Sequence, residues 1–191
     1  MKQRALALTA LLLLLSTVLF ACGKSEVSIS YAEDGSYTGF SDIPTTYTAA
    51  DAIDDGCLVI DTAKGKTEQT AGYEHWESFL AKAKSGKDAF LRVAHFIDGI
   101  GYYRDLYYCD DRYTIFDCNE FGISEGKSYQ HLRRLDGYAG PASAPKPDCF
   151  YVLTDSMLLT YQDVSWSFLS SSTYSVTTTP FEWLGFMTHF E

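Results

Sequence analysis

The clearest periodic pattern in the chain lies at residues 73–85. Four apolar residues recur there at the spacing of one helical face: Trp76, Phe79, Leu80 and Ala83. Glu74 lies near the start and Lys84 near the end, which is the charge order that a helix dipole favours. The pattern predicts an amphipathic helix that ends before Gly86 and buries one stripe of side chains.

Three apolar and aromatic segments follow this helix, separated by short polar turns, and predict an antiparallel β-meander over residues 89–118. A four-residue turn at 98–101 would place Ile97 opposite Tyr102. A two-residue turn at Asp110 and Asp111 would place Cys109 opposite Arg112. Because side chains alternate along a strand, one face should receive the helix. The other face should carry Phe90, Arg92, Phe96, Tyr103, Tyr107 and Phe116.

Weaker signals predict the remaining elements. Thr48 can cap a short helix at 49–55, which Gly56 would stop. A buried strand is expected at 57–61, a polar loop at 63–72, a strand at 128–138, a proline-rich loop at 140–147, a hairpin turning at 155–156 and a buried or contacting apolar end at 181–191. The expected fold class is α+β: an antiparallel β-meander packed against one main α-helix, with a short preceding helix.

The N-terminus has the pattern of an export signal. Lys2 and Arg4 precede a run of 17 mostly apolar residues, Ala5 to Ala21. Such a run is at the lower limit for spanning a bilayer core of about 30 Å. The run stops at Cys22 and the chain becomes polar at once, so cleavage at this point is expected.

The residues around this boundary, Leu19, Phe20, Ala21 and Cys22, resemble the lipobox of bacterial lipoproteins. The resemblance implies that the Cys22 thiol receives a diacylglycerol and that a signal peptidase cuts before it. Two acyl chains hold a protein firmly on a membrane. The implied partner is therefore the cell membrane, with the protein facing outside the cytoplasm. A retained membrane helix and an ordinary cleaved signal are the alternatives.

Three regions are expected along the chain. Residues 1–21 form the lipoprotein signal peptide, residues 22–47 form a tether or loosely ordered arm, and residues 48–191 form a single α+β domain. The arm is rich in Ser, Gly, Asp, Thr and Tyr and has no sustained period. No internal repeat or break divides the rest.

The charge argues against nucleic acid as a partner. The chain carries −10, and loss of Lys2 and Arg4 with the signal would take it to about −12. An acidic protein repels phosphate backbones. We read the charge as a source of solubility.

Four cysteines remain after Cys22, and outside the cytosol they can form disulfides. The meander places Cys109 and Cys118 about 20 Å apart along the ladder, beyond disulfide reach. Pairing of Cys118 or Cys57 with Cys149, or free thiols, stays open. No CxxC spacing supports a zinc site.

No motif with a catalytic mechanism is present. HExxH, the phosphate-binding glycine patterns, GxSxG and the EF-hand spacing are all missing from the sequence. We therefore expect no metal, no cofactor and no enzyme. The alternative is a cell-envelope enzyme that pairs a cysteine with His95 or His131.

Residues 57–118 are similar to a family of small Gram-positive lipoproteins whose domain has no assigned function. The similar features are the helix WESFLAKAKSGK and the meander after it, and no catalytic residue follows from them. The leading hypothesis is a non-catalytic binding module. Its expected contact surface is the aromatic face of the meander, with Tyr103, Tyr107, Phe96, Phe116 and Arg92. Arg92 can orient a polar ligand or pair with Asp105 across the strands.

Overall fold

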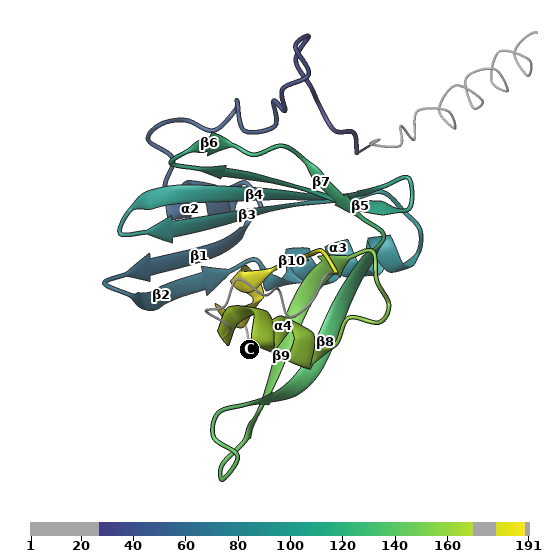
Figure 1. Cartoon of the computed structure of the whole chain (residues 1–191). Coiled ribbons are helices and arrows are strands. Elements are labelled where there is room, and N and C mark those ends of the chain that lie inside the picture. The colour runs from purple at the N-terminus through teal and green to yellow at the C-terminus, as the bar shows by residue number, and fades with distance from the viewer. Residues whose placement is uncertain (1–26, 170–178, 190–191) are drawn as a thin grey trace, which may run out of the picture.

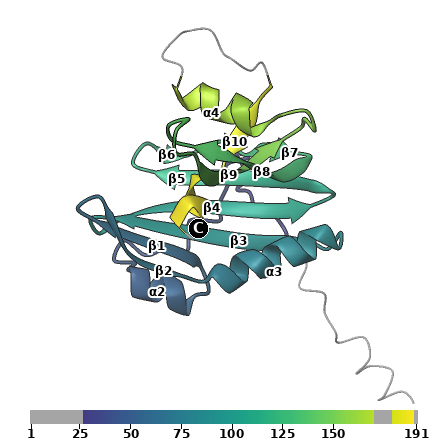
Figure 2. The same cartoon turned by 90° about the horizontal axis from the view of Figure 1, so that it is seen from below.

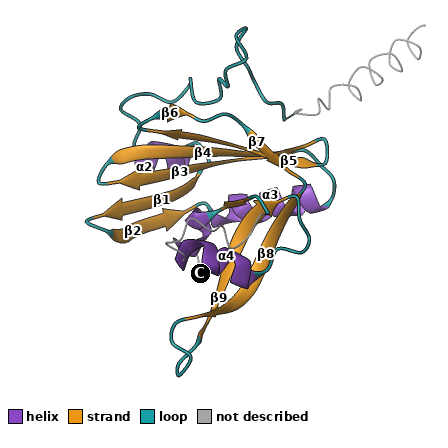
Figure 3. Cartoon of the chain, viewed as in Figure 1, coloured by secondary structure: helices purple, strands orange, loops and turns teal. Residues whose placement is uncertain are grey.

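The computed structural model describes residues 27–169 and 179–189. Within these ranges the chain forms a mixed seven-stranded sheet, a three-stranded antiparallel sheet, three α-helices and a short 3-10 helix (Figure 1). The α+β class is therefore confirmed. Strands dominate the described chain (Figure 3), so a single meander on one main helix is too simple a description.

Both predicted helices form where the sequence places them. Helix α2, Ala49–Asp54, begins with a reciprocal cap: the Thr48 N–H donates to Asp51 Oδ2 at 2.9 Å, and Thr48 Oγ1 accepts from the Asp51 N–H at 3.3 Å. Helix α3, Tyr73–Lys84, buries Trp76, Phe79 and Ala83. The periodic stripe is the buried face of α3.

The large sheet has the strand order β2-β1-β3-β4-β5-β6, with β7 also paired to β5. Its strands are β1 Leu58–Ala63, β2 Lys66–Ala71, β3 Ala89–Ile97, β4 Ile100–Cys109, β5 Arg112–Asn119, β6 Gly122–Ile123 and β7 Lys127–Tyr129. Strand β1 runs parallel to β3, and the other pairings are antiparallel. The meander β3–β5 is thus the centre of a larger sheet.

The polar loop expected at 63–72 is wrong, because β2 occupies most of it. Lys64 and Gly65 both have positive φ, 50° and 73°, and close a two-residue hairpin turn. Strand β2 lies at the edge of the sheet with nearly every side chain exposed. An edge strand with no buried face has no apolar alternation, which is why its sequence suggested a loop.

The meander register is right at one turn and shifted at the other. Cys109 lies opposite Arg112, as predicted from the two-residue turn. The first turn is also two residues long, so Ile97 lies opposite Ile100 instead of Tyr102. This shift of two positions leaves every side chain on its predicted face, because strand side chains alternate with a period of two.

The C-terminal half forms the second sheet, with strands β8 His131–Ala139, β9 Lys146–Thr154 and β10 Phe181–Trp183 in the order β10-β9-β8. The loop between β8 and β9 covers residues 140–145, so the proline-rich loop predicted at 140–147 is right except at Lys146 and Pro147, which begin β9. A hairpin turning at 155–156 was expected, and its first strand is β9. The prediction of a second strand is wrong, because the residues after the turn lead into helix α4, Tyr161–Leu169. Thr160 and Asp163 cap this helix reciprocally. Residues 170–178 lie outside the described residues.

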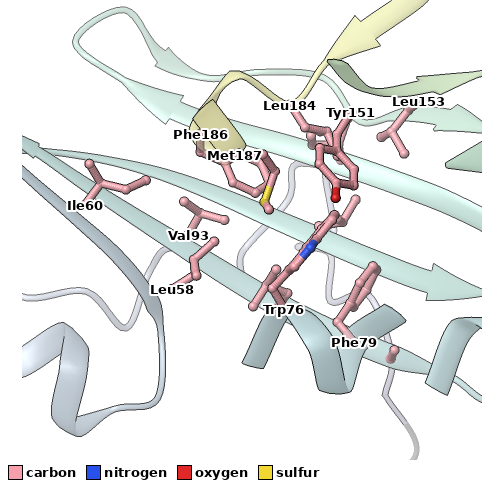
Figure 4. Packing of buried hydrophobic residues seen from close by; sticks show 14 of the residues in the cluster. Leu58, Ile60, Trp76, Phe79, Val93, Tyr151, Leu153, Leu184, Phe186 and Met187 are labelled. Atoms are coloured by element: carbon pink, nitrogen blue, oxygen red, sulfur yellow. The ribbon is translucent and has the colours of Figure 1, made fainter. Parts of the chain in front are cut away.

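The central core lies between the large sheet, helix α3 and the second sheet (Figure 4). Trp76 and Phe79 of α3 meet Leu153 of β9 there. The apolar C-terminal end is buried as predicted: Leu184 and Met187, around the 3-10 helix η1 Gly185–His189, complete the same cluster. Helix α4 packs on the other side of β9, against Val152 (Figure 2). One face of the large sheet is therefore covered by helix, strands and chain end together.

The opposite face of the large sheet is covered by residues 27–47 and α2. Tyr37 and Phe40 are buried against Tyr107 and Phe116. The expectation of a loosely ordered arm does not describe residues 27–47, which run across the sheet (Figure 1). We call residues 27–47 the N-terminal arm.

Candidate functional site

The aromatic face proposed as a contact surface lies beneath the N-terminal arm. Phe96, Tyr107 and Phe116 are only 3%, 6% and 1% exposed. The Tyr37 ring stacks on Phe116, with centroids 3.8 Å apart and planes within 9°. Tyr103 is half-buried. The structure does bring the predicted residues together, but as an internal interface and not as a free surface.

Arg92 and Asp105 form a bidentate ion pair within this interface. Arg92 Nε lies 2.8 Å from Asp105 Oδ1, and a terminal guanidinium nitrogen lies 2.8 Å from Asp105 Oδ2. The same guanidinium donates to Asp42 Oδ1 at 3.2 Å and to the Gly39 carbonyl, both in the arm. Arg92 therefore makes the cross-strand pair that was one of its two predicted roles, and it also holds the arm.

Tyr37 completes this network from the arm. Its hydroxyl donates to Asp105 Oδ2 at 2.6 Å and lies 2.8 Å from the Tyr107 hydroxyl. Because the single Tyr37 proton points at Asp105, Tyr107 is the donor in the second bond. We call Tyr37, Asp42, Arg92, Asp105 and Tyr107 the arm clamp.

Burial dominates the electrostatics of the arm clamp. Asp105 is fully buried, and burial raises its pKa, while the hydrogen bonds and charge of Arg92 and the Tyr37 hydroxyl act in the opposite direction. Burial alone would lower the pKa of Arg92, but its hydrogen bond to Asp105 and the Asp105 charge raise it. Burial thus outweighs the contacts with Arg92 and Tyr37, and the net direction of the Asp105 pKa is upward.

A cavity of about 500 Å³ lies where the large sheet meets the chain end. Strands β3, β4 and β5 form one side, and β10 with η1 forms the other. We call it the seam cavity. Its apolar wall includes Tyr102, Trp183 and Phe186, and its polar wall includes His95, Asn119 and His189. This volume is in the range of small-molecule sites in proteins.

The charged groups of the seam cavity balance one another. Arg104 pairs with Asp117 at 2.5 Å across the strands and with Glu182 at 3.6 Å, and it donates to the Trp183 carbonyl at 3.3 Å. Glu182 does not line the cavity, and it also pairs with Lys127 at 2.9 Å. Among the lining residues, the Arg104 cation thus faces the Asp117 carboxylate.

Two histidines meet at one end of the seam cavity. The rings of His95 and His189 lie 5.3 Å apart between centroids. His95 Nε2 lies 3.1 Å from Thr62 Oγ1, and His189 Nδ1 lies 2.9 Å from Thr67 Oγ1. Burial, followed by the nearby His189, lowers the pKa of His95. The His95 imidazole is therefore predominantly neutral at pH 7.

The cysteines do not have the setting of a nucleophile. Cys109 lies opposite Arg112 and Cys118 lies opposite Tyr103, so the two cysteines are as far apart along the ladder as the predicted register placed them. Burial raises the pKa of Cys57, Cys109 and Cys118, whereas a reactive cysteine needs a lowered pKa.

Two cavities nevertheless combine a cysteine with a histidine. Cys118 and His95 both line the seam cavity, but the strand alternation directs them to opposite faces of the sheet. A second cavity of about 470 Å³, beside α2 and α3, contains Cys57 and His75. The Cys57 sulfur lies 3.9 Å from the Tyr47 hydroxyl. Within the described ranges, no cluster of three His, Cys, Asp or Glu side chains can hold a metal ion.

No single stretch of the sequence predicts the seam cavity. One useful signal was present: the correct turn at Asp110 and Asp111 pairs Arg104 with Asp117 directly across β4 and β5. Nothing local links these residues to Trp183 or His189, which come from the end of the chain. The site exists only once the chain end has packed.

Comparison of the chain with protein-family models, with curated proteins and with solved structures finds no match. The resemblance of residues 57–118 to small Gram-positive lipoproteins therefore stays a prediction. Cys22 and the signal segment lie outside the described residues. Over the ranges that the structure describes, no helix has the length and apolar character needed to span a bilayer.

Proposed function

We propose that this chain is a lipid-anchored extracytoplasmic binding protein without catalytic activity, and that the seam cavity takes its ligand. The observation that carries the proposal is the charge balance of this cavity. Of its lining residues, Arg104 is paired with Asp117, and His95 adds a neutral imidazole. Glu182, behind the lining, pairs with both Arg104 and Lys127. Because each charge has a partner, a ligand with a net charge would gain little there.

The chemistry of the walls favours an uncharged ligand rich in hydroxyl groups, with one apolar face. The ion-paired side chains, Asn119 and the histidines offer donors and acceptors within one wall. Tyr102 and Trp183 offer rings on which an apolar face can lie. A sugar ring has both properties, so we propose a neutral saccharide as the ligand class.

Binding can be tested by calorimetry with three probes on one ring scaffold: neutral N-acetylglucosamine, cationic glucosamine and anionic glucuronate. We expect only the neutral probe to bind. Thr188→Trp should abolish this binding, because residue 188 lines the cavity. Thr70→Trp, on the exposed edge strand β2, is the matched control and should bind normally. Equal binding of charged probes, or binding that survives Thr188→Trp, would contradict the proposal.

The lipid anchor is a separate part of the proposal and has its own test. Cells that express the full chain are given radiolabelled palmitate. We expect the label in the wild type and in a Cys109→Ala control, and none in Cys22→Ala, which should keep its larger uncleaved size. Cys22 is the residue of the lipobox pattern that carries the lipid. Label in Cys22→Ala would disprove acylation at this residue.

The cell-envelope enzyme remains the weaker candidate. Cys118 and His95 share the seam cavity, which is the observation in its favour. Their opposite sheet faces and the raised pKa of Cys118 argue against a nucleophile and base that act together. The paired, charge-balanced walls support binding better than catalysis.

A further inference from the structure

We infer that the arm clamp fixes the orientation of the domain on the membrane, with the β4–β5 turn toward the lipid and the seam cavity away from it. This inference rests on the proposed acylation of Cys22. Five Cα steps separate Cys22 from Val27, the first described residue. At about 3.6 Å per step they span at most about 18 Å. The position of Val27 therefore decides which part of the domain lies near the bilayer.

Val27 lies at the end of the large sheet that carries the β4–β5 turn. Its carbonyl accepts from the Cys109 thiol at 3.5 Å, and Cys109 is the last residue of β4. Figure 1 shows the arm starting beside this end of β4 and β5. The α3–β3 junction lies at the same end, because Ala89 pairs with Tyr108.

The seam cavity lies at the other end of the same strand. Tyr102, one of its lining residues, is seven residues from Cys109 along β4, which is about 24 Å in a strand. A domain held by Val27 thus presents the cavity on the side far from the bilayer, where a ligand outside the cell can enter it.

The charges near the β4–β5 turn are nearly balanced. The basic residues Lys84, Lys87 and Arg112 lie among the acidic residues Asp88, Asp110, Asp111 and Asp155, and Asp155 pairs with Arg112 at 3.6 Å. The chain as a whole carries −10. This end therefore holds only a small part of the excess negative charge, and an anionic bilayer repels it weakly.

The arm clamp is what keeps the tether short. Tyr37 and Asp42 hold the arm to Asp105 and Arg92 in the sheet. If the arm left the sheet, the tether would run from Cys22 to Thr48, about 90 Å when extended. The domain could then rotate freely relative to the bilayer. The arm clamp prevents this rotation because it keeps the free part of the tether short.

Energy transfer to headgroup-labelled lipids can test the orientation. The acylated protein is reconstituted into vesicles with a donor dye on Lys87→Cys or on Lys66→Cys, in a Cys109→Ser/Cys118→Ser background, where the serine at 109 can still donate to the Val27 carbonyl. Both lysines are exposed, and they lie just beyond opposite ends of β3, Ala89–Ile97, a strand about 27 Å long. We expect clearly higher transfer from position 87 than from position 66.

A second variant separates the clamp from the anchor. Tyr37→Ala/Phe40→Ala/Asp42→Ala changes only the arm and should make both transfer efficiencies fall to a common value. Circular dichroism checks that the domain is still folded. Equal or reversed efficiencies in the parent protein would overturn the orientation while leaving the anchor intact. A protein that fails to enter the vesicles would overturn the anchor, and the orientation with it.

Discussion

Replacing Arg92 with alanine is expected to lower the free energy of unfolding by about 3–5 kcal/mol, as for other buried ion pairs that lose one partner. Asp105 is fully buried and depends on Arg92 for two hydrogen bonds and the compensating charge. The change also removes the donors to Asp42 and Gly39, so the arm is loosened at the same time. Urea denaturation followed by circular dichroism measures the loss.

Two variants control this experiment. Arg112→Ala removes an exposed pair with Asp155, whose nitrogen–oxygen distance is 3.6 Å, and should change stability by no more than about 1 kcal/mol. Arg92→Met/Asp105→Leu removes both buried charges and should recover much of the loss. If Arg92→Ala were as mild as Arg112→Ala, the arm clamp would not be a stabilising element.

Replacing Trp76 with alanine is expected to destabilise the protein by about 3–5 kcal/mol, the usual loss for a large buried aromatic residue. The indole is fully buried between the large sheet and the C-terminal segments (Figure 4). It makes edge contacts with Tyr151 and Phe186, with centroids 5.5 and 5.9 Å away. Its removal therefore opens a void at the place where three parts of the fold meet. Urea denaturation gives the magnitude.

Trp76→Phe is the matched control. In the described part of the chain, the indole Nε1 has no hydrogen-bond partner, and an unsatisfied buried donor itself costs about 1–3 kcal/mol. Phenylalanine loses packing area but also removes this donor, so we expect a loss below about 1.5 kcal/mol. Equal losses for the two variants would mean that the indole area is not what stabilises this core.

Patterns within a few residues of each other were enough to predict helices α2 and α3 and the faces of the meander β3–β5. The α3 stripe of Trp76, Phe79 and Ala83 and the reciprocal Thr48–Asp51 cap each lie within a few residues, and both helices form. The faces of β3, β4 and β5 were also right, because alternation survives a shift of two positions. The four-residue turn predicted at 98–101 is wrong: the turn consists of Asp98 and Gly99, with φ of 50° and 83°.

The two findings that bear on function depended on distant segments. The arm looked like a tether because it has no period, yet Tyr37 meets Asp105 and Phe116 far along the chain. The residues of the aromatic face were predicted correctly. The sequence of β3–β5 alone does not show that the N-terminal arm packs on this face. In the seam cavity, Trp183 and His189 meet β3 and β4 only through the tertiary fold.

The burial of the chain end beneath the large sheet has a consequence for the timing of folding. Leu184, Phe186 and Met187 fill the central core, and the His189 ring reaches Thr67, 122 positions earlier. Contacts this far apart in sequence make folding slow. The core of the nascent polypeptide therefore cannot pack completely until residues 184–189 have been synthesised. A chain that must be threaded through a translocation channel before it folds would gain from that delay.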